Sequence, residues 1–132
     1  MSVGRRDYTW GFLNEAAGEG RYRETFIDYF VITISSWIQK TVYSYTVPAG
    51  YRLGITGIFV SCDNGAVNMV LAKAGATQKL IGYFTGSQKF EISDNNPLYF
   101  NAGQVFTIDV YNRDEVSTFC KGWVCGIKEA II

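Results

Sequence analysis

From Thr25 onward, the chain is a succession of short runs in which apolar and polar residues alternate, with turn residues between them. Eight or nine such runs can be recognised, at residues 25–34, 37–47, 51–62, 67–73, 77–84, 89–92, 98–100, 104–112 and 118–128. Alternation with a period of two is the signature of a strand, and this part of the chain sustains no helical period. Short strands spaced roughly 8–12 residues apart predict an all-β sandwich or barrel.

Two of the turns are alike. Gly50 and Gly103 each follow an alanine at the end of a short apolar run, and each opens a new alternating run. A jelly roll has two equivalent halves, because it is built from eight strands in two Greek keys. We therefore predict a two-sheet antiparallel sandwich, jelly-roll-like, with about eight strands and with both glycines at the positive φ that such turns require. Coincidence in a glycine-rich chain is the alternative.

Three local patterns refine this prediction. The run 25–34 is apolar on both faces, as in a strand that is covered on both sides. The alternation in 51–62 slips at Gly57, which predicts a β-bulge. In 104–112 the residues Phe106 and Ile108 are expected to face inward, and Asp109 is expected to face outward as a solvated surface charge.

Residues 1–24 differ from the rest. They contain four glycines, mixed charges and isolated aromatic residues, without a sustained period. We read residues 1–24 as an extended N-terminal arm and residues 25–132 as one β-sandwich domain. Disordered arms are usually poor in aromatic residues. The aromatic residues Tyr8, Trp10 and Phe12 therefore predict that the arm docks, either on its own sandwich or on a neighbouring subunit.

Catalytic signatures are missing from the sequence. The chain contains no histidine, which excludes Ser-His-Asp and Cys-His nucleophilic systems and zinc sites built on histidine. No glycine-rich phosphate loop leads from a strand into a helix. Paired carboxylates such as Asp109 with Glu91 or Asp94 remain formally conceivable. We predict a protein that is not an enzyme, with no cofactor and no catalytic metal. Oxygen-rich loops at 63–64, 94–96 and 112–115 leave calcium binding open beside ordinary turn chemistry.

Charge and cysteine content limit the partners and the compartment. Twelve basic residues balance twelve acidic ones, so the basic footprint of a nucleic-acid-binding protein is absent. No apolar segment is long enough to span a membrane, and the N-terminus lacks the apolar region of a secretory signal. Cys120 and Cys125 would point to opposite faces of a strand. Free thiols are expected, with a Cys62–Cys120 or Cys62–Cys125 bridge as alternatives.

Aromatic residues make up 16% of the chain and apolar residues 48%, which is more than one thin sandwich core readily holds. The surplus favours a homo-oligomer, because aromatic side chains dominate interface energetics. The same residues could instead stack on sugar rings in a carbohydrate- or receptor-binding module. The candidate contact residues are Tyr8, Trp10, Phe12, Tyr83, Tyr99 and Trp123.

The phrases "VPAG" at 47–50 and "NPLYFNAGQVFTIDVYN" at 96–112, together with the aromatic arm, resemble small β-sandwich structural proteins of tailed viruses. The resemblance covers roughly residues 41–127. Gln104 departs from it, because an acidic residue is common at that place in the family. The resemblance implies a capsid decoration (cement) protein or a fibre head, commonly trimeric, that binds the major capsid protein or another virion protein. It further implies a place in the virion, after assembly in the host cytoplasm.

Overall fold

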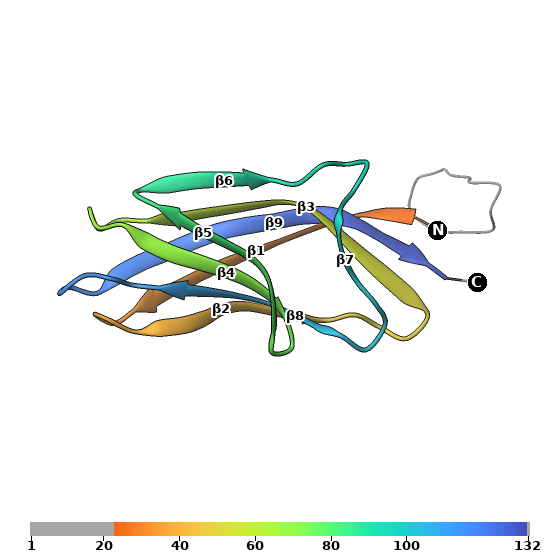
Figure 1. Cartoon of the computed structure of the whole chain (residues 1–132), viewed down its shortest axis with the longest axis horizontal. Coiled ribbons are helices and arrows are strands. Elements are labelled where there is room, and N and C mark those ends of the chain that lie inside the picture. Colours follow the sequence, from red (N-terminus) through yellow and green to blue (C-terminus); the bar gives the residue numbers. More distant parts are fainter. Residues whose placement is uncertain (1–22, 132) are drawn as a thin grey trace.

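The computed structural model describes residues 23–131, and within this part of the chain all regular elements are β-strands (Figure 1). None of the described segments is a helix long and apolar enough to cross a membrane. The strands are β1 (Arg23–Ile34), β2 (Gln39–Thr46), β3 (Tyr51–Cys62), β4 (Asn68–Ala74), β5 (Thr77–Phe84), β6 (Ser87–Glu91), β7 (Leu98–Phe100), β8 (Val105–Tyr111) and β9 (Thr118–Ala130).

The strands form two antiparallel sheets that pack face to face. The five-stranded sheet has the order β1-β9-β3-β6, with β7 also paired to β3, and the four-stranded sheet has the order β2-β8-β4-β5. Because β6 and β7 pair with successive stretches of β3, they act as two pieces of one edge strand. With that pair counted once, eight strands lie in two sheets of four, which is the jelly-roll arrangement. The predicted fold class is confirmed.

The two Ala-Gly turns are matching corners of the sandwich. Gly50 has a φ of 84° and Gly103 a φ of 85°, and each turn is closed by a backbone hydrogen bond from its fourth residue to its first, of 3.2 and 3.0 Å. One turn leads from β2 into β3 and the other from β7 into β8, so each carries the chain from one sheet to the other. The Gly103 N–H donates to the Val47 carbonyl at 2.9 Å, so the corners lie side by side.

The core lies between the sheets and is filled by aliphatic and aromatic side chains. Phe100 and Phe106 are fully buried, with ring centroids 4.6 Å apart. In β3 the pairing with β9 shifts register between Ile55 and Gly57, which is the β-bulge that the slipped alternation predicted. The extra residue allows Ile58 to continue the buried face that Ile55 begins.

One side of β1 contradicts the sequence-based prediction. Phe26, Phe30 and Ile34 are buried against the core as expected, but the opposite side of the strand is open to solvent in the described chain. Within residues 23–131, a strand that is apolar on both faces is therefore covered on one face only. The prediction of a strand covered on both sides is wrong for this described part of the chain.

Asp109 corrects a second expectation. Its side chain lies on the outer face of β8, as the alternation predicted, but the residue is only 4% exposed. The Lys73 ammonium lies 2.7 Å from its carboxylate, and Thr41 and Gln39 donate hydrogen bonds to it at 2.7 and 3.1 Å. Burial opposes ionisation, but these donors outweigh it and hold the pKa of Asp109 below its usual value. Asp109 is a structural ion-pair residue, not a solvated charge.

Candidate interaction surface

A row of aromatic side chains crosses the outer face of the five-stranded sheet. Strand pairing places Tyr29 of β1 opposite Trp123 of β9, Trp123 opposite Phe59 of β3, and Phe59 opposite Lys89 of β6. Residues directly opposite one another in antiparallel strands have neighbouring side chains on the same face. Three strands therefore contribute one aromatic side chain each to the row, and β6 adds Lys89 at its end.

Stacking and a cation position the two central rings of this row. The Phe59 and Trp123 rings are nearly parallel, with an interplanar angle of 15° and centroids 5.7 Å apart. The Lys89 ammonium lies 5.5 Å from the Trp123 ring centroid and 3.2 Å from the Glu91 carboxylate. Such contacts hold flat apolar surfaces in place while one side of them stays available to a partner.

Exposed apolar side chains extend the row along β1 and β9. Tyr29 is 66% exposed, and its neighbours Ile27 and Val31 on the same side of β1 are 53% and 64% exposed. Phe119, near the start of β9, is 46% exposed. We call these residues together the outer apolar face; its members are Ile27, Tyr29, Val31, Phe59, Phe119 and Trp123. The exposed Lys121 of β9, which pairs with Val31, lies among them. Clustered exposed apolar residues mark interaction sites more often than isolated ones do.

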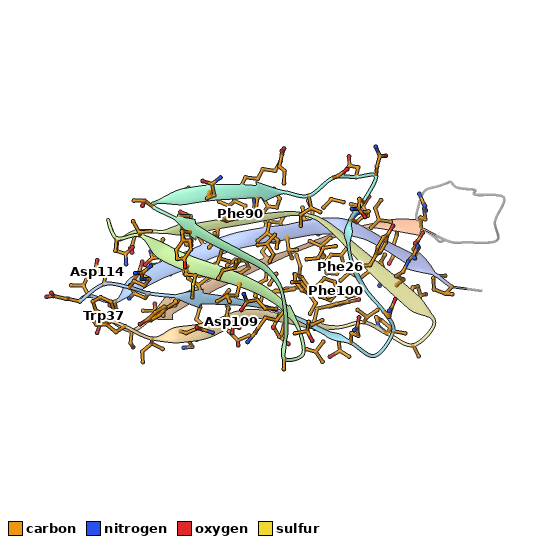
Figure 2. The ribbon with its side chains drawn as sticks, viewed as in Figure 1. Phe26, Trp37, Phe90, Phe100, Asp109 and Asp114 are labelled. Carbon is orange, nitrogen blue, oxygen red and sulfur yellow. The ribbon has the colours of Figure 1, made fainter. Side chains whose placement is uncertain are left out.

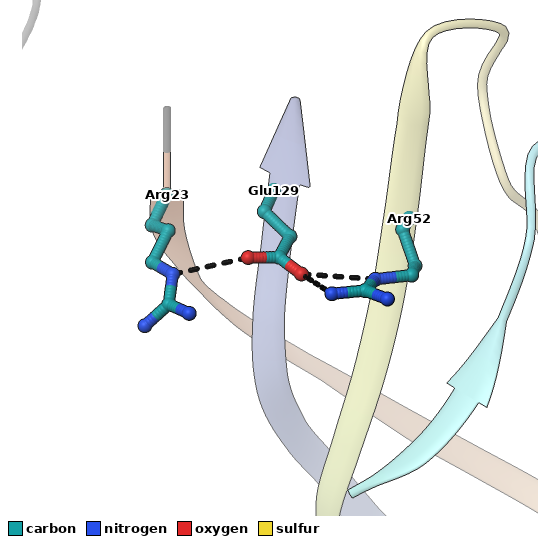
Figure 3. A network of polar contacts seen from close by, with 3 residues as sticks. All are labelled: Arg23, Arg52 and Glu129. Atoms are coloured by element: carbon teal, nitrogen blue, oxygen red, sulfur yellow. Dashed lines mark hydrogen bonds and ion pairs between the residues drawn. The ribbon is translucent and has the colours of Figure 1, made fainter. Parts of the chain in front are cut away.

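An ion-pair network lies at one end of the same sheet (Figure 3). Glu129 of β9 is 3% exposed and accepts hydrogen bonds from Arg23 of β1 at 3.0 Å and from the Arg52 Nε of β3 at 2.9 Å. A second nitrogen of Arg52 contacts the same carboxylate oxygen. Burial opposes ionisation of Glu129, but the two guanidinium groups outweigh it and keep its pKa below the ordinary value. The outer face of the sheet is therefore charged at this end.

The loops at the far end of the sandwich are held together by asparagine side chains. The Asn112 amide donates to three backbone carbonyls, of Ile34, Ser35 and Val116, at 2.8–3.2 Å. Asn64 donates to the Asn112 side chain, and Asn68 donates to Asn64, both at 2.8 Å. These groups use their oxygens for turn chemistry, and residues 23–131 contain no cluster of acidic or cysteine side chains suited to a metal ion. Figure 2 shows Trp37 and Asp114 at this end.

The predicted contact residues are divided between the two sheets. Trp123 lies in the outer apolar face, half-buried. Tyr99 of β7 is 39% exposed and lies against Arg52, whose guanidinium is 4.2 Å from the ring centroid. Tyr83 of β5 is 57% exposed but belongs to the four-stranded sheet. The structure therefore does not bring these three aromatics into one platform. Tyr8, Trp10 and Phe12 lie outside the described residues.

Five members of the outer apolar face were missing from the sequence-based candidates: Ile27, Tyr29, Val31, Phe59 and Phe119. The signal for three of them was present, because the run 25–34 is apolar at odd as well as even positions. That pattern predicts a strand covered on both sides, without indicating what covers the second side. Phe59 and Phe119 carried no comparable signal, because their proximity to Tyr29 and Trp123 depends on strand pairing.

No protein-family model and no curated protein matches this chain. Among solved structures, it is similar to a chain in the cryo-EM structure of virus-like particles of the giant freshwater prawn Macrobrachium rosenbergii extra small virus (XSV). The two share 12% identity with a TM-score of 0.31, over 96% of this chain and 91% of that chain. A likeness at this level carries no argument about function, and the outer apolar face stands on its own geometry.

Proposed function

We propose that this protein is a virion structural protein of the capsid decoration, or cement, type. In this proposal it performs no reaction and acts by association with other copies of itself and with a shell protein. The phrases that resemble tailed-virus sandwich proteins include the two Ala-Gly turns, and these turns occupy equivalent corners of the jelly roll. That equivalence supports the resemblance from which the virion assignment comes.

The observation that carries the proposal is the open side of β1. Its sequence is that of a strand buried on both faces, yet Ile27, Tyr29 and Val31 are each more than half exposed. Removing apolar surface from water stabilises an association by about 25 cal/mol per Å² before the costs of association are subtracted. A second protein surface that covers this side of β1 would therefore remove these apolar side chains from water.

The arrangement of the face resembles that of a protein–protein interface. The stacked pair Phe59 and Trp123 supplies a rigid aromatic centre, and charged groups border it through Lys89 on one strand and Arg23 on another. Interfaces commonly combine an apolar centre rich in aromatic residues with a polar rim. We propose that copies pack through this face around a symmetry axis, as a homotrimer.

The proposal extends to residues outside the described part of the chain. Tyr8, Trp10 and Phe12 would bind the shell lattice or a neighbouring subunit. A trimer that engages three lattice sites gains effective concentration without any new contact, so modest single contacts would suffice. Deletion of residues 2–20 should then weaken attachment to particles. Equal attachment of the truncated protein would contradict this part of the proposal.

Two exposed tyrosines on opposite outer faces provide a matched test. Tyr29 lies in the outer apolar face and Tyr83 on the other sheet, with similar exposed fractions of 66% and 57%. Tyr29→Ser should weaken self-association roughly tenfold or more if Tyr29 is a hot spot, whereas Tyr83→Ser should leave it unchanged. Light scattering and sedimentation over a concentration series measure both variants. A wild-type chain that stays monomeric throughout, or a larger effect of Tyr83→Ser, would overturn the proposed interface.

The virion assignment needs a separate measurement. If the proposal is right, mass spectrometry of virus particles purified from the biological source of this sequence should detect peptides of this chain. Their absence from purified particles would contradict a virion role even if the protein self-associates. Quenching of tryptophan fluorescence by added saccharides, with no self-association, would instead indicate the carbohydrate- or receptor-binding alternative.

A further inference from the structure

We propose that Cys62 and Cys120 form a cross-strand disulfide site that closes when the folded protein meets a low-molecular-weight disulfide. Cys62 is the last residue of β3 and Cys120 the third residue of β9, and the two are direct partners in the antiparallel pairing of these strands. Both thiols are free and buried, on the side of the sheet that faces the core. The sequence had left bridges from Cys62 to Cys120 and to Cys125 equally open.

The type of pairing suits a disulfide. The Cys62 N–H donates to the Gly86 carbonyl, beside β6, at 2.9 Å, so the backbone groups of Cys62 point away from β9. Cys62 and Cys120 are therefore a non-hydrogen-bonded pair, in which opposite Cα atoms lie about 4.5 Å apart and side chains approach most closely. Disulfides span Cα separations of about 4.4–6.8 Å. The bond can form without moving either strand along the other.

Side-chain contacts fix the register next to the pair. The Asp63 carboxylate accepts hydrogen bonds from the Thr118 hydroxyl and from the Phe119 N–H, both at 2.9 Å. In return, the Asp63 N–H donates to the Thr118 hydroxyl at 3.2 Å. These bonds continue the β3–β9 pairing past the last backbone partners. Cys62 is consequently held opposite Cys120 even though the pair lies at the end of the sheet.

The contact between the thiols makes them chemically unequal. The contact with Cys120 lowers the pKa of Cys62 despite its burial. The same contact and burial raise the pKa of Cys120. Cys62 is therefore the better source of thiolate, the form that attacks disulfides. Its position beside the loop that follows β3 means that opening only the strand end exposes it.

The reaction is a two-step exchange that balances. The Cys62 thiolate attacks one sulfur of the small disulfide, which forms a mixed disulfide and releases one small thiolate. Cys120 then loses its proton, attacks the Cys62 sulfur and releases the second small thiolate, as the S–S bond between Cys62 and Cys120 forms. The two protein thiols lose two electrons and two protons in total, and the small disulfide is reduced to two thiols.

Cys125 serves as an internal control because it lies on the other face of the sheet. It pairs with Gly57 of β3, and its sulfur lies 3.9 Å from the Thr56 hydroxyl. Cys125 is five residues from Cys120 on one strand, so the two side chains project to opposite faces, as the sequence predicted. In the folded chain, Cys125 cannot replace either member of the pair without disruption of the sheet.

The test uses the full folded chain and bis(2-hydroxyethyl) disulfide as the oxidant. Intact mass should show the loss of two hydrogen atoms, and peptide mapping without reduction should link Cys62 to Cys120 in the wild type and in Cys125→Ser. Cys120→Ser should instead accumulate a mixed disulfide at Cys62. Closure of such a long loop should raise the thermal midpoint by about 10 °C, reversibly on reduction.

Several outcomes would overturn the site. Linkage of Cys62 to Cys125, linkage only after the protein has been unfolded, or no linkage in the folded wild type would each contradict it. The wild-type peptide map carries the decision even if Cys120→Ser fails to fold. Since the readouts are covalent linkage and thermal stability, they are independent of self-association and of the proposed virion role.

Discussion

Lys73 reaches Asp109 diagonally across two strands of the four-stranded sheet. Lys73 is paired with Thr107, and Asp109 with Leu71, yet the Lys73 ammonium lies 2.7 Å from the Asp109 carboxylate. The long lysine side chain thus covers a carboxylate that would otherwise face water. The pair stabilises the outer face of the four-stranded sheet, whereas the five-stranded sheet carries the outer apolar face between its own ion pairs.

Removal of the lysine should destabilise the fold. Lys73→Met would leave the Asp109 carboxylate covered, with only Thr41 and Gln39 to solvate it. The cost of a covered charge without its counter-ion should lower the free energy of unfolding by about 2 kcal/mol. Urea denaturation followed by tryptophan fluorescence measures it.

The matched control is Lys89→Met, which breaks the exposed pair with Glu91. Exposed pairs contribute less than about 1 kcal/mol, and Lys89 and Glu91 have side chains that are 49% and 74% exposed. Equal effects of the two lysine substitutions would contradict a structural role for the Lys73–Asp109 pair.

Glu129 should make stability depend on acid pH. Its pKa is lower in the folded chain than its ordinary value of about 4.3. Its stabilising contribution is therefore complete above the unfolded-state pKa and is lost as the pH falls through the lower folded-state pKa. The stability difference between wild type and Glu129→Gln, from urea midpoints, should be largest near neutral pH and should shrink under strongly acidic conditions. A difference that widens as the pH falls would exclude this linkage.

Gly103 should be required for its backbone conformation. A Cβ at Gly103 or at Gly65 would meet no atom within 4 Å, but only Gly103 has a positive φ, of 85°. Gly103→Ala should cost about 1–2 kcal/mol from backbone strain, whereas Gly65→Ala should be neutral or slightly stabilising. Thermal unfolding of both variants separates the two cases. If Gly65→Ala cost as much as Gly103→Ala, loss of a glycine as such would be the cause, not the corner geometry.

Asn112 should be essential for the loop end of the sandwich. The residue is fully buried, and its amide serves three carbonyls. Asn112→Ala should therefore lower the free energy of unfolding by about 3 kcal/mol, because several buried polar groups lose their partner. It should also speed proteolysis of the neighbouring loops. Asn95→Ala, at an exposed loop position, is the control and should change neither the free energy of unfolding nor the rate of proteolysis. If Asn112→Ala changed these two quantities as little as Asn95→Ala, the role assigned to the asparagine network would be contradicted.

Local chemistry in the sequence predicted much of the fold. Gly50 and Gly103 follow alanines in turns that need a positive φ, and the slip in alternation at Gly57 can be accommodated only by an extra residue. Both signals depend on neighbours in sequence, and the structure confirms both. The burial of Asp109 was not predictable in this way, because Lys73 reaches it only through the pairing of β4 with β8.

The candidate surface was predictable only in part, for the same reason. Trp123 could be nominated as a surplus aromatic residue, but its stacking on Phe59 and its position opposite Tyr29 depend on the register of three strands. The run 25–34 predicts a strand covered on both sides, but within the described residues one side of β1 is open. The apolar pattern of a run indicates which side chains favour burial. It does not indicate whether the same chain or another chain covers them.

The divided edge of the five-stranded sheet limits how copies can add to one another. β1 presents an unbroken edge of 12 residues, whereas the opposite edge consists of β6 with 5 residues and β7 with 3, separated by a loop that contains Pro97. An open strand edge is a template for further strands, and short or proline-interrupted edges are poor templates. Growth of this sheet by strand addition therefore has a single usable direction. Once two β1 edges have met, the edges of this sheet that remain in the described chain are the short β6 and β7. Strand addition through β1 would therefore stop at a pair of chains and would not continue into a fibril.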